Sequence, residues 1–354
     1  MKHVETQIFS FDPSHIDDNA LKIISDGVCV GKIVAFPTET VYGIGSLHTN
    51  RETLNRICEL KGRAETKPFA LYIHNIKQLE EFHFIFPHYF KIITDTFWPG
   101  PLTLIIETKH GEKHGIRFPE QPITKRFLML LPTLLKGTSA NRSGEQSITN
   151  AQDVYKQFKN MIDFIIDGGV CKYGQESTVI DTTFVPCVVI RKGILWENIE
   201  AFFNTHNINY LAKKKVLIVC TGNTCRSPMV SGVLIDSFKR MNLIHTIEID
   251  SCGVYSPFSI APSQYAIDVL RNEGIDISWH RSKSITPKLI HEADKIIVMT
   301  KEHELIVNEM SKKVQNKILV LGISDPLGKG LQFYKETFLI IKSNLEEMIA
   351  WIQK

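Results

Sequence analysis

The chain has 354 residues, of which 43% are hydrophobic and 22% are charged, a composition that excludes wholesale disorder and fibrous proteins. At about 150 residues per domain, this length predicts two domains, each large enough to bury its own core. The 41 basic and 38 acidic residues leave a formal net charge of +3, which gives no electrostatic basis for a nucleic-acid packaging role.

Cysteines and apolar segments indicate the compartment. The seven cysteines are irregularly spaced and do not form the pattern of a secreted disulfide framework or of a metal site. No stretch approaches the roughly 18 apolar residues that span a bilayer, and the first residues lack a basic start followed by an apolar run. We therefore expect a cytoplasmic protein that does not interact with membranes.

Residues 1–205 are expected to form the first domain. Strand-like runs occur at 31–36, 67–73, 101–106 and 177–182, with helical stretches between them and with turns rich in proline and glycine. This order predicts a mixed α/β domain.

Residues 206–213 are expected to be a linker, because the pattern of strand-like and helical runs differs before and after this stretch and a run of lysines follows. In the second domain, 214–354, strand-like runs alternate with helical runs. The strand-like runs are 215–220, 247–250, 295–300 and 317–321, and the helical runs are 237–242, 266–275 and 338–352. Such alternation predicts a small, doubly wound, four-stranded parallel sheet with its ligand site at the carboxyl ends of the strands.

The most specific motif lies directly after the first strand of the second domain, where Cys220 and Arg226 bracket five residues ahead of a helix. A loop that closes onto a helix N-terminus directs successive N–H groups inward and forms an anion cradle of phosphate size. Gly222 and Asn223 suit the positive φ values that such a loop needs. The expected phosphate loop comprises Thr221, Gly222, Asn223, Thr224, Cys225 and Ser227, beside the catalytic Cys220 and Arg226.

Each catalytic candidate has a chemical role. A thiol at a helix terminus beside a guanidinium is expected to have a pKa lowered to roughly 3.5–7.5, so Cys220 is predicted to be a thiolate nucleophile. Arg226 can bind two phosphoryl oxygens through its planar fork, and the Ser227 hydroxyl can donate to the thiolate. Asp325, which follows the last strand-like run, is predicted to protonate the leaving group and later to activate water.

Cys220–Pro228 together with Asp325-Pro326 resembles the low-molecular-weight protein tyrosine phosphatases, and the resemblance covers about 214–354. Thr224 is similar to the threonine of the protein-arginine phosphatase branch, whereas tyrosine-specific members carry a bulky aliphatic residue; Leu327 and Lys329 depart from that branch. The resemblance implies a phosphoprotein substrate, no cofactor, and a Cys225 that either forms a reversible disulfide with Cys220 or is a buried structural thiol. The alternatives are a tyrosine phosphatase and an arsenate reductase, although no resolving cysteine follows position 252.

Short polar and basic clusters lie at the edges of strand-like runs in the first domain. They contain five cations and four hydroxyl or amide side chains: Lys61, Arg63, Lys67, Arg117, Arg191, Ser139, Asn141, Ser177 and Thr178. So many cations predict a polyanionic ligand such as a triphosphate, and no P-loop motif is present.

These ordered clusters, among them IVAFPTETVYGIG, KGRAETKPFALYI and GTSANRSG, resemble the YrdC-like threonylcarbamoyl-AMP synthases over roughly 10–200. The resemblance implies that threonine, bicarbonate and ATP with Mg²⁺ are the substrates, and that a downstream tRNA threonylcarbamoyl transfer machinery is a partner. It assigns ATP to Lys61, Arg63, Lys67, Asn141, Thr149 and Arg191, and threonine to Thr38, Arg117, Ser139 and Ser177. Positioning is expected to do most of the catalysis, without a protein nucleophile. The alternative is a catalytically silent module that holds RNA phosphates in the same basic surface.

Overall fold

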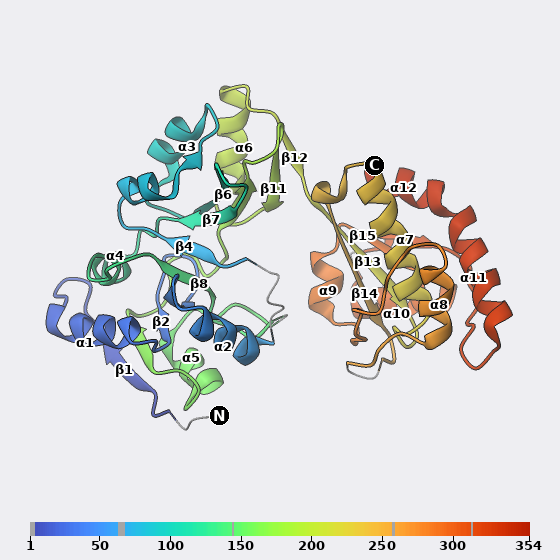
Figure 1. The fold of residues 1–354 in the computed structure, drawn as a ribbon, viewed down its shortest axis with the longest axis horizontal. Coiled ribbons are helices and arrows are strands. Elements are labelled where there is room, and N and C mark those ends of the chain that lie inside the picture. Colours follow the sequence, from blue (N-terminus) through green and yellow to red (C-terminus); the bar gives the residue numbers. More distant parts are fainter. Residues whose placement is uncertain (1–3, 63–67, 144, 257–258, 313) are drawn as a thin grey trace. The chain divides into compact units, whose positions relative to one another are not determined.

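The computed structural model describes residues 4–62, 68–143, 145–256, 259–312 and 314–354. The chain divides into two compact units, one ending at Ala212 and the other beginning at Lys213. Both units contain helices and strands, so the predicted α/β class is confirmed (Figure 1). Within the described ranges, no helix is both long and apolar enough to cross a membrane.

The first unit is built on one mixed sheet with the strand order β1-β9-β2-β3-β8-β4-β7-β6-β10-β11-β12, and β5 pairs with β6. The strands are β1 (Gln7–Ser10), β2 (Val34–Phe36), β3 (Gly43–Leu47), β4 (Ala70–Tyr72), β5 (Phe84–Ile85), β6 (Leu102–Thr108), β7 (Lys113–Arg117), β8 (Leu135–Ser139), β9 (Phe164–Asp167), β10 (Thr178–Asp181), β11 (Cys187–Arg191) and β12 (Tyr210–Ala212). The helices are α1 (Asp18–Cys29), α2 (Arg51–Lys61), α3 (Phe90–Phe97), α4 (Pro122–Met129), α5 (Ala151–Phe158) and α6 (Trp196–Thr205), with the 3₁₀ helix η1 (Ile76–Phe82).

Two local features position site residues in this unit. Helix α2 ends at Gly62, whose φ of 59° provides the left-handed C-cap, and this places Lys61 in the last turn. After β11, the chain passes so close to the start of β10 that a Cβ atom on Gly193 would lie 2.3 Å from the Glu176 carbonyl oxygen. Glycine is therefore required at position 193, and its close approach brings Arg191 to Ser177.

The second unit contains the predicted four-stranded parallel sheet, in the order β14-β13-β15-β16. Its strands are β13 (Lys214–Cys220), β14 (Ile247–Gly253), β15 (Lys295–Val298) and β16 (Ile318–Val320). Its helices are α7 (Arg226–Arg240), α8 (Gln264–Arg271), α9 (Pro287–Glu292), α10 (Lys301–Met310), α11 (Leu331–Ser343) and α12 (Leu345–Gln353), with the 3₁₀ helices η2 (Ile244–Thr246) and η3 (Gln315–Lys317). Alternate residues of β13 enter opposite cores, as Ile218 packs with α7, α8 and α11 while Leu217 packs with α9 and α10.

Two expected segments differ from the structure. The helix expected at 338–352 is interrupted at Asn344, which caps the end of α11 with φ −89° and ψ −1° and whose side-chain amide also donates to the Ile340 carbonyl at 2.8 Å. A side chain that occupies a helical carbonyl competes with the backbone ladder. The expected linker 206–213 includes β12, which pairs in parallel with β11 and so belongs to the first unit.

Candidate active sites

The expected phosphate loop lies between β13 and α7. Cys220 is the last residue of β13 and Arg226 is the first residue of α7. The Sγ atom of Cys220 lies 2.9 Å from Ser227 Oγ and accepts the backbone N–H of Asn223 at 3.2 Å. Because α7 starts at this loop, its N-terminal partial positive charge adds to the field that favours an anion there.

Asn223 holds the loop in shape with a φ of 53°. Its side-chain oxygen accepts the N–H of Lys283 at 2.9 Å, which orients the amide. Its Nδ2 atom therefore donates to Ser227 Oγ at 2.9 Å and to Ser251 Oγ at 3.0 Å. Since the oxygen of Ser227 accepts this bond, the hydroxyl proton of Ser227 remains available to donate to Cys220.

Gly222 does not take the positive φ that we expected, and that prediction is wrong. A Cβ atom on Gly222 would lie 3.5 Å from Thr224 Oγ1, which is an ordinary contact. The turn is therefore made by the left-handed backbone of Asn223 rather than by the glycine.

Arg226 and Asp325 meet although 99 residues separate them. Arg226 is 3% exposed; its Nη1 donates to the Ile323 carbonyl at 3.1 Å, and its Nη2 donates to Thr221 Oγ1 at 2.9 Å. The same Nη2 forms an ion pair with Asp325, whose side chain is 38% exposed. The structure thus brings Cys220, Arg226 and Asp325 to one end of the sheet, with the carboxylate at the solvent side.

The pKa of Cys220 does not shift as we expected. Burial of the thiol is the largest influence and raises its pKa, because the thiolate loses hydration. The hydrogen bonds from Ser227 and Asn223 and the charge of Arg226 lower it, in the direction that we expected from the helix terminus. The prediction that the pKa of Cys220 is lowered is therefore wrong for this buried thiol. The hydrogen bonds from Ser227 and Asn223 still stabilise the thiolate when it forms.

Thr224 and Cys225, the other loop residues, have different surroundings. Thr224 is half-buried, with its Oγ1 3.7 Å from the Sγ of Cys225. Cys225 is a buried free thiol that lies 3.3 Å from the Tyr334 hydroxyl and 3.4 Å from Ser263 Oγ. Leu327, which departs from the arginine-phosphatase pattern, is 61% exposed.

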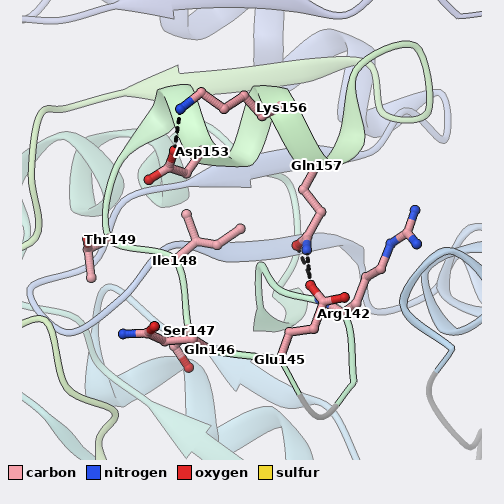
Figure 2. A pocket seen from close by; sticks show the side chains of 9 residues that line it. All are labelled: Arg142, Glu145, Gln146, Ser147, Ile148, Thr149, Asp153, Lys156 and Gln157. Carbon is pink, nitrogen blue, oxygen red and sulfur yellow. Dashed lines mark hydrogen bonds and ion pairs between the residues drawn. The ribbon is translucent and has the colours of Figure 1, made fainter.

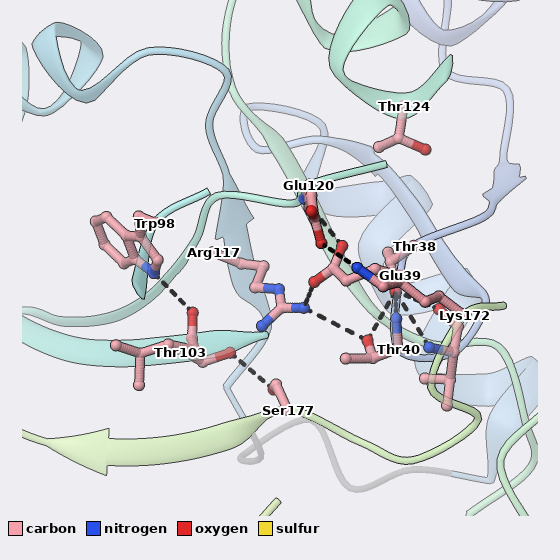
Figure 3. Close-up of polar contacts among 12 residues, drawn as sticks. Thr38, Glu39, Thr40, Trp98, Thr103, Arg117, Glu120, Thr124, Lys172 and Ser177 are labelled. Atoms are coloured by element: carbon pink, nitrogen blue, oxygen red, sulfur yellow. Dashed lines mark hydrogen bonds and ion pairs between the residues drawn. The ribbon is translucent and has the colours of Figure 1, made fainter. Parts of the chain in front are cut away.

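In the first unit, Arg117 at the end of β7 is buried against the turn that follows β2. Its Nη2 contacts Glu39 Oε1, and the other oxygen of Glu39 accepts the backbone N–H of Glu120 at 2.9 Å. Figure 3 shows the guanidinium between Glu39–Thr40 and the Thr103–Ser177 pair. Its Nη1 is buried without a hydrogen-bond partner in the described part of the chain. Burial lowers the pKa of Arg117, while Glu39 raises it.

Thr38 lies in the same turn, and its hydroxyl group forms hydrogen bonds with the backbone of that turn. Its Oγ1 donates to the Val41 carbonyl at 2.6 Å and accepts the backbone N–H groups of Thr40 and Val41 at 3.1 and 3.2 Å. This hydroxyl therefore shapes the backbone that carries Glu39.

Ser177 and Arg191 form the opposite side of the same site. Arg191 donates from Nε to the Ser177 carbonyl at 2.9 Å and from Nη2 to Ser177 Oγ at 3.0 Å, and its Nη1 contacts Glu176. Burial raises the pKa of Tyr72 to about 12, with further effects from the charges of Arg117, Glu39, Arg191 and Glu176. The two sides of the site are joined through Thr103, which pairs with Arg117 across β6 and β7 and whose Oγ1 lies 3.0 Å from Ser177 Oγ.

Lys61, Ser139 and Asn141 form a second group. The Lys61 Nζ atom, at the end of α2, contacts the backbone carbonyls of Ser139 and Asn141. The amide nitrogen of Asn141 donates to the carbonyls of Arg142 and Glu145 at 3.0 and 2.9 Å. Its Oδ1 is buried and has no hydrogen-bond partner among the described residues.

Thr149 lies on the wall of an open hollow of about 600 Å³ (Figure 2). The hollow is lined by Arg142, Glu145, Gln146, Ser147, Ile148, Thr149, Asp153, Lys156 and Gln157. The hydroxyl of Ser147 donates to Glu176 at 2.6 Å, and Glu176 also pairs with Arg191. Through Ser147 and Glu176, the wall of the hollow is therefore linked by hydrogen bonds to the site that contains Ser177 and Arg191.

Arg63 and Lys67, the remaining residues assigned to ATP, lie outside the described residues. Glu39 and Glu176, which pair with Arg117 and Arg191, were not predicted. Glu39 lies in the IVAFPTETVYGIG motif and Glu176 directly before Ser177, so a search for an acidic partner to each cation would have found them.

Two family models match the chain. The Sua5–YciO–YrdC model, described as "Telomere recombination", matches residues 28–193, and the model of low molecular weight phosphotyrosine protein phosphatases matches residues 215–354. The matched ranges contain all the site residues described in the respective units.

Relatives with assigned names match the two parts of the chain. A threonylcarbamoyl-AMP synthase of Pyrococcus abyssi is 36% identical over 187 residues, 50% of this chain; the chain thus spans about half (55%) of that relative's length. The threonylcarbamoyl-AMP synthase of Bacillus subtilis is 36% identical over 64% of this chain and 73% of its own length.

For the second unit, a Ralstonia nicotianae protein named "Probable low molecular weight protein-tyrosine-phosphatase EpsP" is 31% identical over 40% of this chain and 95% of its own length. The protein-arginine-phosphatase of Bacillus subtilis is 28% identical over 39% of this chain and 94% of its own length. The chain therefore belongs to two enzyme families, the Sua5–YrdC threonylcarbamoyl-AMP synthases in its first unit and the low-molecular-weight phosphatases in its second.

Proposed function

We propose that the first unit makes threonylcarbamoyl-AMP and pyrophosphate from threonine, bicarbonate and ATP, for the N6-threonylcarbamoyladenosine at position 37 of tRNA. The buried Arg117, held by Glu39 and left with an unpartnered Nη1, is the observation that carries this proposal. A guanidinium edge of this kind fits a small carboxylate such as that of threonine, because the fork of arginine matches carboxylate geometry.

ATP occupies the hollow of Figure 2 in this proposal, with its phosphates toward Arg191. Glu176 partly neutralises Arg191, and an incoming phosphate replaces that carboxylate as the partner of the guanidinium. Mg²⁺ enters with the phosphates of ATP in this proposal, because it is usually bound through substrate phosphates and keeps several of its waters.

The reaction needs orientation more than a protein nucleophile. Carbamate formation on the threonine amine, followed by attack of the carbamate oxygen on the α-phosphate, places the developing charge on the phosphates and the leaving pyrophosphate. Fixed cations stabilise that charge, and bound neighbours gain effective concentration.

Pyrophosphate release by the full chain tests this proposal. We expect release to require ATP, Mg²⁺, threonine and bicarbonate together, because the nucleophile is the carbamate formed from the last two. Equal release without threonine would contradict the proposal. The rival RNA-binding module would release none and would bind RNA with an affinity that falls steeply with salt.

We propose that the second unit hydrolyses a phosphoryl group through phosphocysteine. The thiolate of Cys220 attacks phosphorus, the bond to the leaving atom breaks, and the carboxyl proton of Asp325 moves to that atom. Asp325 then takes a proton from water, which attacks phosphorus and releases phosphate and the thiolate. Arg226, buried beside both groups, pairs with the phosphoryl oxygens as charge spreads over them.

Phosphoarginine is the substrate that we propose, and the half-buried Thr224 beside the loop supports it. A small hydroxyl side chain leaves space and a hydrogen-bond partner for a phosphoguanidinium, whereas a larger aliphatic chain packs on a phenyl ring. The name of the Bacillus subtilis relative gives further support.

Replacing Thr224 with isoleucine is expected to lower kcat/KM for a phosphoarginine protein relative to a phosphotyrosine peptide by about tenfold or more, since added methylenes fill the pocket. Thr224→Ser is the matched control and keeps the wild-type ratio. A wild-type preference for phosphotyrosine would refute the substrate and leave the hydrolytic mechanism standing.

A further inference from the structure

His303 lies outside the phosphate loop but is hydrogen-bonded to it. The side chain is 5% exposed, near the start of α10. Its Nε2 lies 3.0 Å from Thr221 Oγ1, and its Nδ1 lies 2.8 Å from Thr300 Oγ1. Thr221 Oγ1 is also the atom that accepts a hydrogen bond from Arg226 Nη2 at 2.9 Å. A buried imidazole is thus one hydroxyl away from the guanidinium that binds the phosphoryl group.

The donor capacity of each group fixes the direction of this chain. Arginine has donors and no acceptor, so Arg226 donates and the oxygen of Thr221 accepts. This leaves the hydroxyl proton of Thr221 free to donate to Nε2 of His303. On the other side of the ring, the Thr300 hydroxyl donates to Glu302, so its oxygen accepts the Nδ1–H of His303, and Nε2 of the neutral imidazole is the acceptor.

The surrounding charges agree with a neutral imidazole. Burial lowers the pKa of His303, and Arg226 on α7 lowers it further, while Glu302 on α10 and Asp325 after β16 raise it. At the far end of this series of hydrogen bonds, a hydrogen bond from Thr300 lowers the pKa of the exposed Glu302. Donation therefore runs in one direction from the guanidinium to a carboxylate, an arrangement in which each bond polarises the next.

We propose that neutral His303 is a positioning residue for Arg226, acting through the Thr221 hydroxyl. Without the acceptor at Nε2, the Thr221 hydroxyl loses its fixed rotamer, and the Nη2 atom of Arg226 is held chiefly by Asp325, whose side chain faces solvent. The guanidinium is then less well oriented toward a phosphoryl group, and orientation errors of this kind reduce rates steeply. The inference rests on the proposed phosphatase function.

Three variants of the full chain test the inference with para-nitrophenyl phosphate as substrate and inorganic phosphate as competitive inhibitor. His303→Leu keeps the buried volume and removes the acceptor; we expect kcat/KM to fall about tenfold and the Ki of phosphate to rise similarly, the effect of one hydrogen bond to a charged group. His303→Gln restores an acceptor near Nε2 and is expected to recover most of this loss. Thr221→Val is expected to match His303→Leu, and the double variant to be no worse than either single variant.

A purely structural histidine predicts a different pattern. His303→Leu would then lower the melting temperature without changing the phosphate Ki, or the losses in the double variant would multiply. Either result, or a His303→Gln variant that melts like wild type yet is as impaired as His303→Leu, overturns the inference. A wild-type chain without phosphatase activity would instead refute the proposed function, which keeps the two failures distinct.

Discussion

Replacing Cys220 with serine is expected to lower the phosphatase rate by about 10⁶-fold, the loss seen when a catalytic nucleophile is removed. A serine hydroxyl ionises far less readily than a thiol, and the donors around the Sγ atom, Ser227 Oγ at 2.9 Å and the Asn223 N–H at 3.2 Å, cannot offset that difference. Steady-state release of phosphate from para-nitrophenyl phosphate measures the loss.

Cys252→Ala is the matched control for this variant. Cys252 is a buried free thiol of β14 in the same unit, outside the phosphate loop. We expect it to keep a rate close to that of wild type. Appreciable turnover by Cys220→Ser, or a comparable loss in the control, would show that phosphocysteine is not the intermediate.

Replacing Arg117 with alanine is expected to abolish threonine-dependent pyrophosphate release and to destabilise the first unit by about 3–5 kcal/mol, the cost of leaving one partner of a buried ion pair alone. Both side chains of the Arg117–Glu39 pair are 3% exposed, so the carboxylate of Glu39 would lose its counter-charge away from water. Hydrogen exchange of β2 and β7 peptides in the full chain measures the local stability, because it resolves one unit from the other.

A double variant separates stability from function at this site. Arg117→Met with Glu39→Gln removes both charges and is expected to recover much of the stability, since a buried ion pair is often replaceable by uncharged groups. Threonine-dependent activity should remain absent, because the guanidinium is still missing. Recovery of activity in the double variant would contradict a role for Arg117 in binding the threonine carboxylate.

The architecture of the second unit could be predicted because strand and helix alternate in its sequence. Parallel strands end at one edge, so the residues that follow them must meet there. Cys220 at the end of β13 and Asp325 after β16 accordingly lie against one guanidinium, that of Arg226. The residues that fix the loop from other elements, Ser251 on β14 and His303 on α10, were not predicted, because nothing in a local motif points to partners so distant in sequence.

In the first unit the cations were visible in the sequence but their partners were not. Glu39 and Glu176 lie 78 and 15 residues from the arginines they pair with, and the pairing depends on the order of strands in a mixed sheet. Thr38 was predicted to bind the substrate threonine, but its hydroxyl forms hydrogen bonds within its own turn. The local motifs therefore show which side chains are charged, whereas the partner of each charge depends on the fold.

The errors in the second unit have physical causes that a motif does not display. The pKa of Cys220 depends on a burial that only the packed fold reveals, and burial outweighs the nearby donors and charge. The break between α11 and α12 falls at Asn344, whose side chain bonds to the Ile340 carbonyl within an otherwise continuous apolar pattern.

The central claim is that one chain carries two independent active sites, and both activities measured on the same purified variants test it most directly. We expect Cys220→Ser to lose phosphate release while retaining threonine- and bicarbonate-dependent pyrophosphate release, and the Arg117→Met, Glu39→Gln double variant to show the reverse. Loss of both activities in either variant would contradict the claim of independent sites.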